Sequence, residues 1–419
     1  MGLLDNMRKK IGNKNLEKKM RLYKAVNKER PVIGLVVTTF DKGGLEQVVL
    51  NLYSGYKKKG YTVFLLCQEN ILGIMAESIE KDNLFVFNSD ELTFVELIAN
   101  HCITVLHYHY NVFMMKKMKS IGVKVIYTMH NVYTWKSSAE IRDYATLLSS
   151  ADCVIPVSDF VSDYFVSRSE YTSANIKVIY NGIRVEALVA NNENEMISRS
   201  ALGILSDDIA IAFIASFYPV KAQIGMIGVM EKIVSMRDDI KLLLVGNIGD
   251  PGYYEKFQEL YEPSVAKESI VLVPYFDHKY MGYFLRNTCD IFILPTLQEG
   301  CSNAVLEAII CDKPSIITNV GNAMQIINLS SCIVVPTAYD DLTLLENNDI
   351  TRISLEKNMQ NQQEIVNAIE TIANSIEDYK VNAKLSEEEK DKYSDEYMIS
   401  EYCHVIDSLF STERNAKYV

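Results

Sequence analysis

The segment from Glu299 to Glu307 carries two carboxylates with seven residues between them, on either side of the expected start of a helix. The stretch from Gly300 to Ala304 is small enough for backbone N–H groups to face a phosphate, which a helix N-terminus favours. Carboxylates accept hydrogen bonds from hydroxyl groups, so the segment combines the groups that a nucleotide sugar requires. By spacing alone, an acid at a helix N-terminus and a glutamate on a helix surface would be the simpler explanation.

Two further loops contain residue types that suit anions. Residues 41–46 include Gly43 and Gly44 between an expected strand and helix, where a glycine turn lets the backbone approach a ligand closely. Glycine turns of this kind are also common without a ligand. Residues 215–221 follow another expected strand, and Lys221 could neutralise a phosphate. A solvated lysine after a proline turn is the ordinary alternative.

Three histidines raise the question of a metal site. His107 and His109 alternate along one expected strand and so share a face, and His130 follows the next strand. Imidazoles are common zinc ligands. The favoured alternative is that these side chains line a cleft or pack in the core, and we expect no metal.

These segments lie in a chain that alternates strands and helices. Residues 32–37 form an apolar, β-branched run that predicts a buried strand, and residues 45–59 carry apolar side chains at helical spacing. Further strands are expected at 61–66, 104–106, 123–128 and 154–157. Strands that are apolar along their whole length suit a parallel sheet covered on both faces.

The same alternation restarts after Asn181-Gly182, which predicts a second domain. Its expected strands lie at 209–215, 241–245, 270–273, 291–294 and 315–318, and its expected helices at 223–236, 279–287, 303–311 and 364–377. Two such series predict two doubly wound α/β domains. The predicted units are an extension over 1–30, an N-terminal domain over 31–182, a C-terminal domain over 183–390 with an exposed polar insertion at about 338–362, and a last amphipathic helix within 391–412.

Length and composition fit this organisation. The chain has 419 residues, 48% of them hydrophobic and 23% charged, as in soluble globular proteins of two or three domains. The net charge of −12 argues against a general nucleic-acid-binding protein. Eight cysteines without C-x-x-C spacing suit free thiols in a reducing cytoplasm. No apolar run reaches the ~20 residues of a membrane span, and we expect no signal peptide.

The ordered set of loops resembles that of the retaining GT-B-type glycosyltransferases of family 4, which use nucleotide sugars. The resemblance covers about residues 31–337 and resumes over 363–412. Its most specific part is 299–307 with the preceding Leu294-Pro295-Thr296; supporting stretches are 43–52, Thr128-Met129-His130-Asn131, Val157-Ser158-Asp159 and 178–183. It implies the GT-B fold, in which two Rossmann-like domains face each other across a cleft. The N-terminal domain would take the acceptor, the C-terminal domain the donor, and the last helix would cross back to the N-terminal domain.

The resemblance also implies a role for each matching residue. Lys221 would bind the donor diphosphate, Glu299 would contact sugar hydroxyls, and Glu307 would accept from the ribose hydroxyls; with His130, which matches a histidine beside the transferred sugar, Lys221 and Glu299 form the implied catalytic set. The remaining donor contacts would come from Gly43, Gly44, Ser216, Gly246, Asn247, Tyr275, Phe276, Gly300, Cys301, Ser302, Asn303 and Ala304. Of these, Gly246, Asn247, Tyr275 and Phe276 fall where the base is usually held.

Two positions depart from the family pattern. The family commonly has an arginine five residues before the lysine, where this chain has Ser216, and Arg184 stands where an aspartate is usual. A diphosphate leaving group needs charge stabilisation, which the loss of a bidentate guanidinium should weaken. Either another cation, such as Lys42 or Arg184, substitutes or activity is low.

The implied activity is that of a hexosyltransferase-type enzyme. It would move a sugar, with UDP-sugar as the expected donor, to a glycan, lipid-linked or protein-linked acceptor in bacterial surface glycan synthesis. The anomeric configuration would be retained by a front-face route in which the leaving phosphate accepts the acceptor proton. No metal cofactor is implied, because lysine and helix amides neutralise the charge. The alternatives are a nucleotide-sugar epimerase on the same fold and a non-catalytic nucleotide-sugar-binding subunit.

The net charge hides an asymmetry between the N-terminal extension and the remainder of the chain. Residues 1–30 carry +7 and the other 389 residues −19. Within the extension, Leu4, Met7 and Ile11 share one helical face. One interpretation is an interfacial helix that brings a cytoplasmic enzyme to anionic lipid at the inner face of the cell membrane. The other is a solvated extension or an arm that binds a partner.

Overall fold

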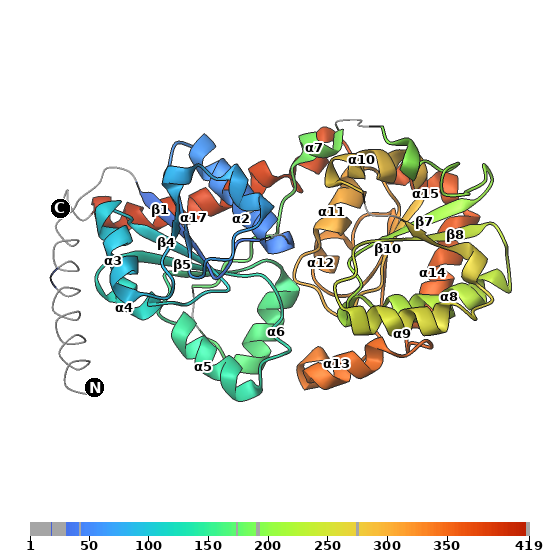
Figure 1. The fold of residues 1–419 in the computed structure, drawn as a ribbon, viewed down its shortest axis with the longest axis horizontal. Helices are drawn as coiled ribbons and strands as arrows, with labels where there is room; N and C mark the ends of the chain where they lie inside the picture. Colours follow the sequence, from blue (N-terminus) through green and yellow to red (C-terminus); the bar gives the residue numbers. More distant parts are fainter. Residues whose placement is uncertain are drawn as a thin grey trace.

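The computed structural model describes residue 18 and residues 31–41, 43–172, 175–189, 193–273 and 276–415, with side chains as far as residue 410 (Figure 1). Apart from Lys18, the predicted amphipathic extension therefore lies outside the described residues, as do Lys42 and Tyr275. Within the described part of the chain, no helix combines the length and hydropathy that a membrane span requires.

The N-terminal domain is built on a six-stranded parallel sheet. Its strand order is β3-β2-β1-β4-β5-β6. The strands are β1 (Val32–Val37), β2 (Thr62–Cys67), β3 (Leu84–Val86), β4 (Val105–His109), β5 (Lys124–Met129) and β6 (Cys153–Pro156). β1 is buried along its whole length, which explains its uninterrupted apolar sequence.

Helices cover both faces of this sheet (Figure 1). Ile33, Leu35 and Val37 of β1 join one core with α2 (Gly44–Lys58) and α17 (Asp395–Asn415), whereas Val32 and Val36 join the core of the other face. That second face is covered by α3 (Glu91–Asn100), α4 (Met115–Ser120), α5 (Ser138–Leu148) and α6 (Asp159–Ser169). Because side chains alternate along a strand, the residues of β1 contribute to two hydrophobic cores, one on each face of the sheet.

The C-terminal domain repeats the design. Its sheet has the order β12-β11-β10-β7-β8-β9 and is parallel throughout. The strands are β7 (Ile209–Ile214), β8 (Ile240–Val245), β9 (Ile270–Val273), β10 (Ile291–Leu294), β11 (Ser315–Thr318) and β12 (Cys332–Val335). The main helices are α8 (Gln223–Val234), α9 (Pro251–Tyr261), α11 (Asn303–Ile310), α12 (Ala323–Ile326), α13 (Asn347–Ser354) and α14 (Gln362–Asn374). The two sheets confirm the predicted pair of doubly wound domains.

Helix boundaries differ from the prediction in two places. The segment expected as one helix over 279–287 is a short 3₁₀ turn, a single helical turn α10 (Met281–Tyr283) and a π-helical turn over Phe284–Thr288. The segment expected over 364–377 is divided between α14 and α15 (Ile376–Asn382), followed by the exposed α16 (Glu387–Asp391).

Two chain segments connect the domains side by side. The first passes through Gly182 and Ile183, before α7 (Val185–Val189), and the second through Tyr393 and Asp395 on its return to α17. Ile183 N donates to Tyr393 O at 3.0 Å, and Asp395 N donates to Ile183 O at 2.9 Å. A Cβ atom on Gly182 would lie 2.0 Å from Ser394 O, so only glycine fits this crossing.

The last helix completes the N-terminal domain. Ile399 of α17 lies against Gly55 of α2, where a Cβ atom would be 2.2 Å from its Cδ1. Lys58 of α2 donates to Glu396 at 2.8 Å, and Tyr402 is fully buried. The far end of the sequence therefore forms part of the first domain's core.

The expectation of an exposed insertion at 338–362 is wrong for part of this segment. Leu342, Ile350, Ile353 and Met359 are buried, and α13 contacts the 3₁₀ turn Pro219–Lys221 and α8. The polar composition concealed a few apolar residues, of which Ile350 and Ile353 share a helix face. The glycines of α8 provide the space: a Cβ atom on Gly225 would lie 2.3 Å from Met359 Sδ.

Candidate active site

The loop that follows β10 is where the two domains meet. A Cβ atom on Gly300 would lie 1.9 Å from the backbone oxygen of His130, which follows β5 of the other domain. Ser158 Oγ donates to Gly300 O at 2.6 Å, and Thr134 Oγ1 donates to Gln298 Oε1 at 2.8 Å. Asn181 Nδ2 donates to Cys301 O at 3.2 Å. The residues predicted from the two domains therefore do come together.

Lys221 and Glu299 form an ion pair at the carboxyl ends of β7 and β10. Their side chains are only 22% and 18% exposed. The neighbouring backbone holds the two loops together, since Leu297 N donates to Val220 O at 2.8 Å and Thr296 Oγ1 donates to the same oxygen at 2.7 Å. The cation and the carboxylate are thus fixed side by side, and an anion that binds Lys221 must compete with Glu299.

Glu307 has a partner that the sequence analysis did not identify. Its Oε1 lies 2.8 Å from His278 Nε2, and the glutamate side chain is 10% exposed whereas the histidine is 63% exposed. The hydrogen bond and the negative charge of Glu307 raise the pKa of His278. No motif surrounds His278 in the sequence, so only the fold could place it here.

The segment between these glutamates presents a helix N-terminus to the cleft. The first N–H groups of α11 have no acceptor within the helix. The N-terminal cap residue, Ser302, forms no side-chain capping bond, and its own N–H donates to Asn322 Oδ1 at 3.2 Å. Burial raises the pKa of Cys301 to about 12, so this thiol stays protonated. The segment therefore offers hydrogen-bond donors to an anion rather than a nucleophile.

The three histidines form a column at the carboxyl end of β4 and β5. His109 Nδ1 lies 2.8 Å from His130 Nε2, and His107 Nε2 lies 2.7 Å from Thr128 Oγ1. Tyr56 OH is 3.3 Å from His107 Nδ1. Burial lowers the pKa of His107 and His130 to about 3 and that of His109 well below its ordinary value. These imidazoles are neutral and bonded to one another or to hydroxyls.

In the part of the chain that the structure describes, no group of three or more His, Cys, Asp or Glu side chains is arranged to hold a metal ion. The His107–His109–His130 column has a different arrangement, because two of its rings are joined through their nitrogens.

The predicted glycine turn lies directly before α2. Gly43 is the N-terminal cap residue of α2, and a Cβ atom on it would lie 2.6 Å from Glu46 Oε2, whereas Gly44 faces open space. Burial raises the pKa of Glu46. The pKa of Tyr110 is raised by burial and also by the charges of Glu299 and Glu46. Tyr110, which sequence reasoning did not select, also lies beside a predicted site residue, since its ring centroid is 5.7 Å from that of His130.

The predicted base-binding residues extend the site along the C-terminal sheet. A Cβ atom on Gly246 would lie 2.1 Å from Ala215 O, and Phe217 N donates to Asn247 O at 2.8 Å. Phe276 lies with its ring centroid 5.2 Å from that of Phe284. These contacts place Gly246 and Asn247 beside the loop that carries Lys221; Tyr275 lies outside the described residues.

Ser216 supplies no charge to this loop. Its backbone oxygen accepts from Gln223 Nε2 at 2.9 Å. Arg184, one of the two suggested substitutes, has its Nε 3.9 Å from Asp395 Oδ2 in the connection between domains. The other, Lys42, is outside the described residues.

Comparisons with known proteins match both domains. The sequence model described as Glycosyltransferase Family 4 matches residues 42–187, and the one described as Glycosyl transferases group 1 matches residues 195–362. A Bacillus subtilis protein named as glycosyltransferase EpsF is 22% identical over 306 residues, which are 68% of this chain and 78% of EpsF. The B. subtilis protein named as teichuronic acid biosynthesis glycosyltransferase TuaC is 25% identical over 212 residues, and the match spans half of each chain.

The fold has solved counterparts. The crystal structure of Anabaena HepE in complex with UDP superposes with a TM-score of 0.71 at 15% identity, covering 90% of this chain and all of HepE. At this identity the likeness concerns the fold, and it confirms the predicted GT-B arrangement.

Proposed function

The chain belongs to glycosyltransferase family 4, and on that premise we propose that it is a retaining hexosyltransferase that moves a sugar from a UDP-sugar to a glycan, lipid-linked or protein-linked acceptor. The HepE complex with UDP supports the choice of base. The name of TuaC supports a role in bacterial surface glycan synthesis.

One observation carries the proposal: the Lys221–Glu299 pair stands beside the N-terminus of α11, opposite His130 of the other domain. The diphosphate of the donor displaces Glu299 as the ionic partner of Lys221 and binds the first-turn amides of α11. Glu299, released, accepts from the hydroxyls of the sugar. Glu307 accepts from the ribose hydroxyls in place of His278.

The same residues support metal-independent transfer with retention. Lys221 and the helix amides stabilise the charge that develops on the leaving diphosphate. The leaving phosphate accepts the proton of the acceptor hydroxyl, so no protein base is required. Neutral His130 serves as a hydrogen-bonding partner of the sugar, because its low pKa keeps it uncharged at pH 7.

Ser216 favours a second candidate, a subunit that binds a nucleotide sugar without transferring it. The loop has one cation, Lys221, where the family commonly has two, and Arg184 is engaged with Asp395. With less positive charge beside the leaving diphosphate, the nucleotide sugar can still bind while its transfer fails.

The first experiment measures donor binding by thermal shift over a panel of UDP-, GDP- and ADP-sugars, followed by release of nucleoside diphosphate with an acceptor library. A bound donor should raise the melting temperature. Lys221→Ala should abolish this shift, whereas Lys232→Ala, at an exposed position of α8, should leave it intact. Donor binding without turnover against any acceptor would favour the non-catalytic subunit, and no shift with any donor would overturn both candidates.

A further inference from the structure

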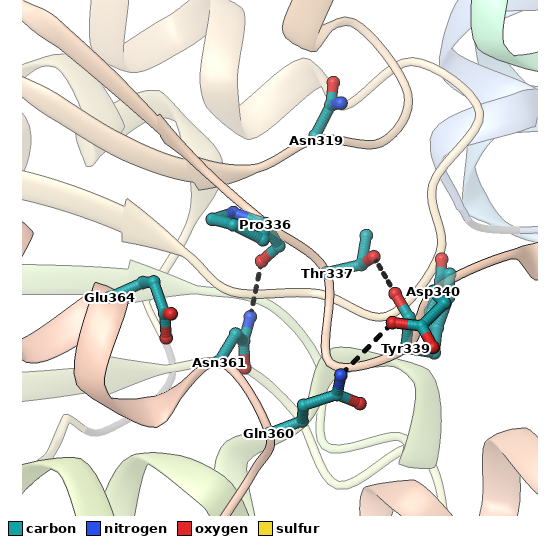
Figure 2. Close-up of a pocket in the computed structure, with 8 residues that line it drawn as sticks. All are labelled: Asn319, Pro336, Thr337, Tyr339, Asp340, Gln360, Asn361 and Glu364. Atoms are coloured by element: carbon teal, nitrogen blue, oxygen red, sulfur yellow. Dashed lines mark hydrogen bonds between the residues drawn. The ribbon is translucent and has the colours of Figure 1, made fainter.

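Two adjoining cavities lie at the junction of the domains, beside the site described above. The larger has a volume of about 440 Å³ and is bounded by α6 of the N-terminal domain, the loop after β11 and the first part of the insertion. The smaller, of about 340 Å³, continues it toward the start of α14 (Figure 2). Both are lined by Asn319, Thr337, Tyr339 and Asp340. They therefore adjoin, and the two together are called the hollow below.

The hollow adjoins the loop of Glu299. Gly321 lines the larger cavity, and a Cβ atom on it would lie 2.9 Å from Glu299 Cβ. Tyr339, in the wall of both cavities, donates its hydroxyl to Leu297 O, two residues before Glu299. The walls of the hollow thus pack against the loop that carries Glu299, the carboxylate that we assign to the transferred sugar, although Glu299 itself is not among the lining residues.

The insertion and the N-terminal domain close the hollow together. Arg168 of α6 donates to Thr343 O at 3.1 Å and to Leu345 O at 3.4 Å. Its guanidinium also lies 5.7 Å from the centre of the Tyr164 ring. The arginine is thereby engaged in joining the two walls and is not among the residues that line the cavity.

The lining has a distinct chemistry. Phe160, Tyr164 and Tyr339 supply aromatic surface, and Asp159, Asp163 and Asp340 supply carboxylates. None of the described residues that line either cavity is a lysine, arginine or histidine. Aromatic surface with a few polar groups suits a sugar ring, whose hydroxyls donate to the carboxylates. A phosphate or uronate would be repelled by these carboxylates, because no cation among the described lining residues would compensate its negative charge.

We propose that this hollow binds the glycosyl acceptor and selects a hydroxyl-rich sugar that carries no negative charge, either neutral or amino. The proposal rests on the proposed function, because it takes Glu299 as the point of transfer. It adds that the first part of the insertion builds part of the acceptor site and determines its specificity.

The test uses the full-length protein with UDP bound and a panel of p-nitrophenyl glycosides of glucose, galactose, N-acetylglucosamine, glucosamine and glucuronic acid. Binding at millimolar concentration is followed by saturation-transfer NMR. Donor binding, measured separately by thermal shift, tests the proposed function alone. We expect at least one neutral or amino glycoside to bind, and the glucuronide to bind about tenfold more weakly or not at all.

Two substitutions locate the binding. Met324 lines the larger cavity and is 53% exposed, so Met324→Trp should fill the hollow without disturbing the core and abolish glycoside binding. Met236 is 55% exposed and lies just beyond α8, so Met236→Trp is the matched control and should bind as the unaltered protein does. Asp340→Arg should improve glucuronide binding.

Each other outcome overturns the inference. Equal binding of glucuronide and glucoside would remove the charge selectivity. If both tryptophan variants retain glycoside binding, or if both lose it, the acceptor binds elsewhere. If UDP-sugar raises the melting temperature but no glycoside binds, the proposed function stands and the acceptor site does not.

Discussion

At the scale of single residues, the hydrogen bonds of the buried histidine column indicate which ring nitrogens carry the protons. His109 has a nitrogen, Nε2, that is buried without a hydrogen-bond partner among the described residues. A buried N–H without an acceptor is rarer than an unused acceptor. The proton of His109 should therefore reside on Nδ1 and point to His130 Nε2, which leaves the proton of His130 on its other nitrogen.

The low pKa values of this column predict a loss of stability in acid. The folded state holds His107 and His130 neutral down to about pH 3, whereas the unfolded chain takes up protons near pH 6.5. Stability should be complete above pH 6.5 and fall as pH decreases, by at most about 1.4 kcal/mol per pH unit for each histidine. Urea unfolding at pH 7.5, 6.5 and 5.5 measures this slope.

A matched pair of variants identifies the source of that slope. His107→Gln removes one buried imidazole and should flatten the pH dependence even though it lowers stability overall. His404→Gln, at an exposed position on α17, should leave the slope unchanged. An identical slope in all three proteins would show that other groups cause the acid sensitivity.

At the scale of elements, apolar patterns predicted the strands correctly, whereas the polar composition of the insertion gave a wrong prediction of its exposure. Strands such as β1 and β7 were predictable because their apolar runs are uninterrupted. The packing of the segment after α13 was not, because Lys357 and Met359 lie against Gly228 and Gly225, whose significance appears only when another segment lies on α8. Likewise the motif around Glu299 indicated the site, but His278 and Tyr110 reach it only through the fold.

The close contact on α8 predicts a strongly position-dependent effect of alanine. A Cβ atom on Gly228 would lie 2.2 Å from the backbone oxygen of Lys357, so Gly228→Ala must displace the insertion and lower stability by about 1–3 kcal/mol. Gly252 in α9 has its nearest neighbour at 3.5 Å, so Gly252→Ala should be neutral or slightly stabilising. Thermal unfolding of the two variants gives the comparison, and equal effects would contradict the assigned packing.

At the scale of the whole molecule, the two domains are in close contact. Their contact at Gly300 leaves no room for a side chain. Gly300→Ala should hold the domains apart at His130 and reduce turnover about tenfold or more, because misplaced groups lose transition-state contacts. Steady-state kinetics and small-angle scattering measure the two effects. Full activity in this variant would mean that the domains are not required to touch here.

The basic residues 1–30, which lie almost entirely outside the described part of the chain, make a separate prediction at this scale. If they form an interfacial helix, the full chain should float with anionic liposomes and a variant without these residues should not. Raising the salt concentration should weaken the association. Equal flotation of both proteins would leave the interpretation as a solvated extension or a partner-binding arm.

The return of α17 to the first domain has a consequence for synthesis on the ribosome. The sheet β1–β6 emerges early, but α17, which packs on α2 and contains the buried Tyr402, is translated only after the whole second domain. Until then an apolar face of the nascent chain is exposed, and the first domain cannot complete its fold before the second domain has been synthesised. A stop codon shortly before residue 395 should therefore yield an aggregating product rather than an inactive but folded one.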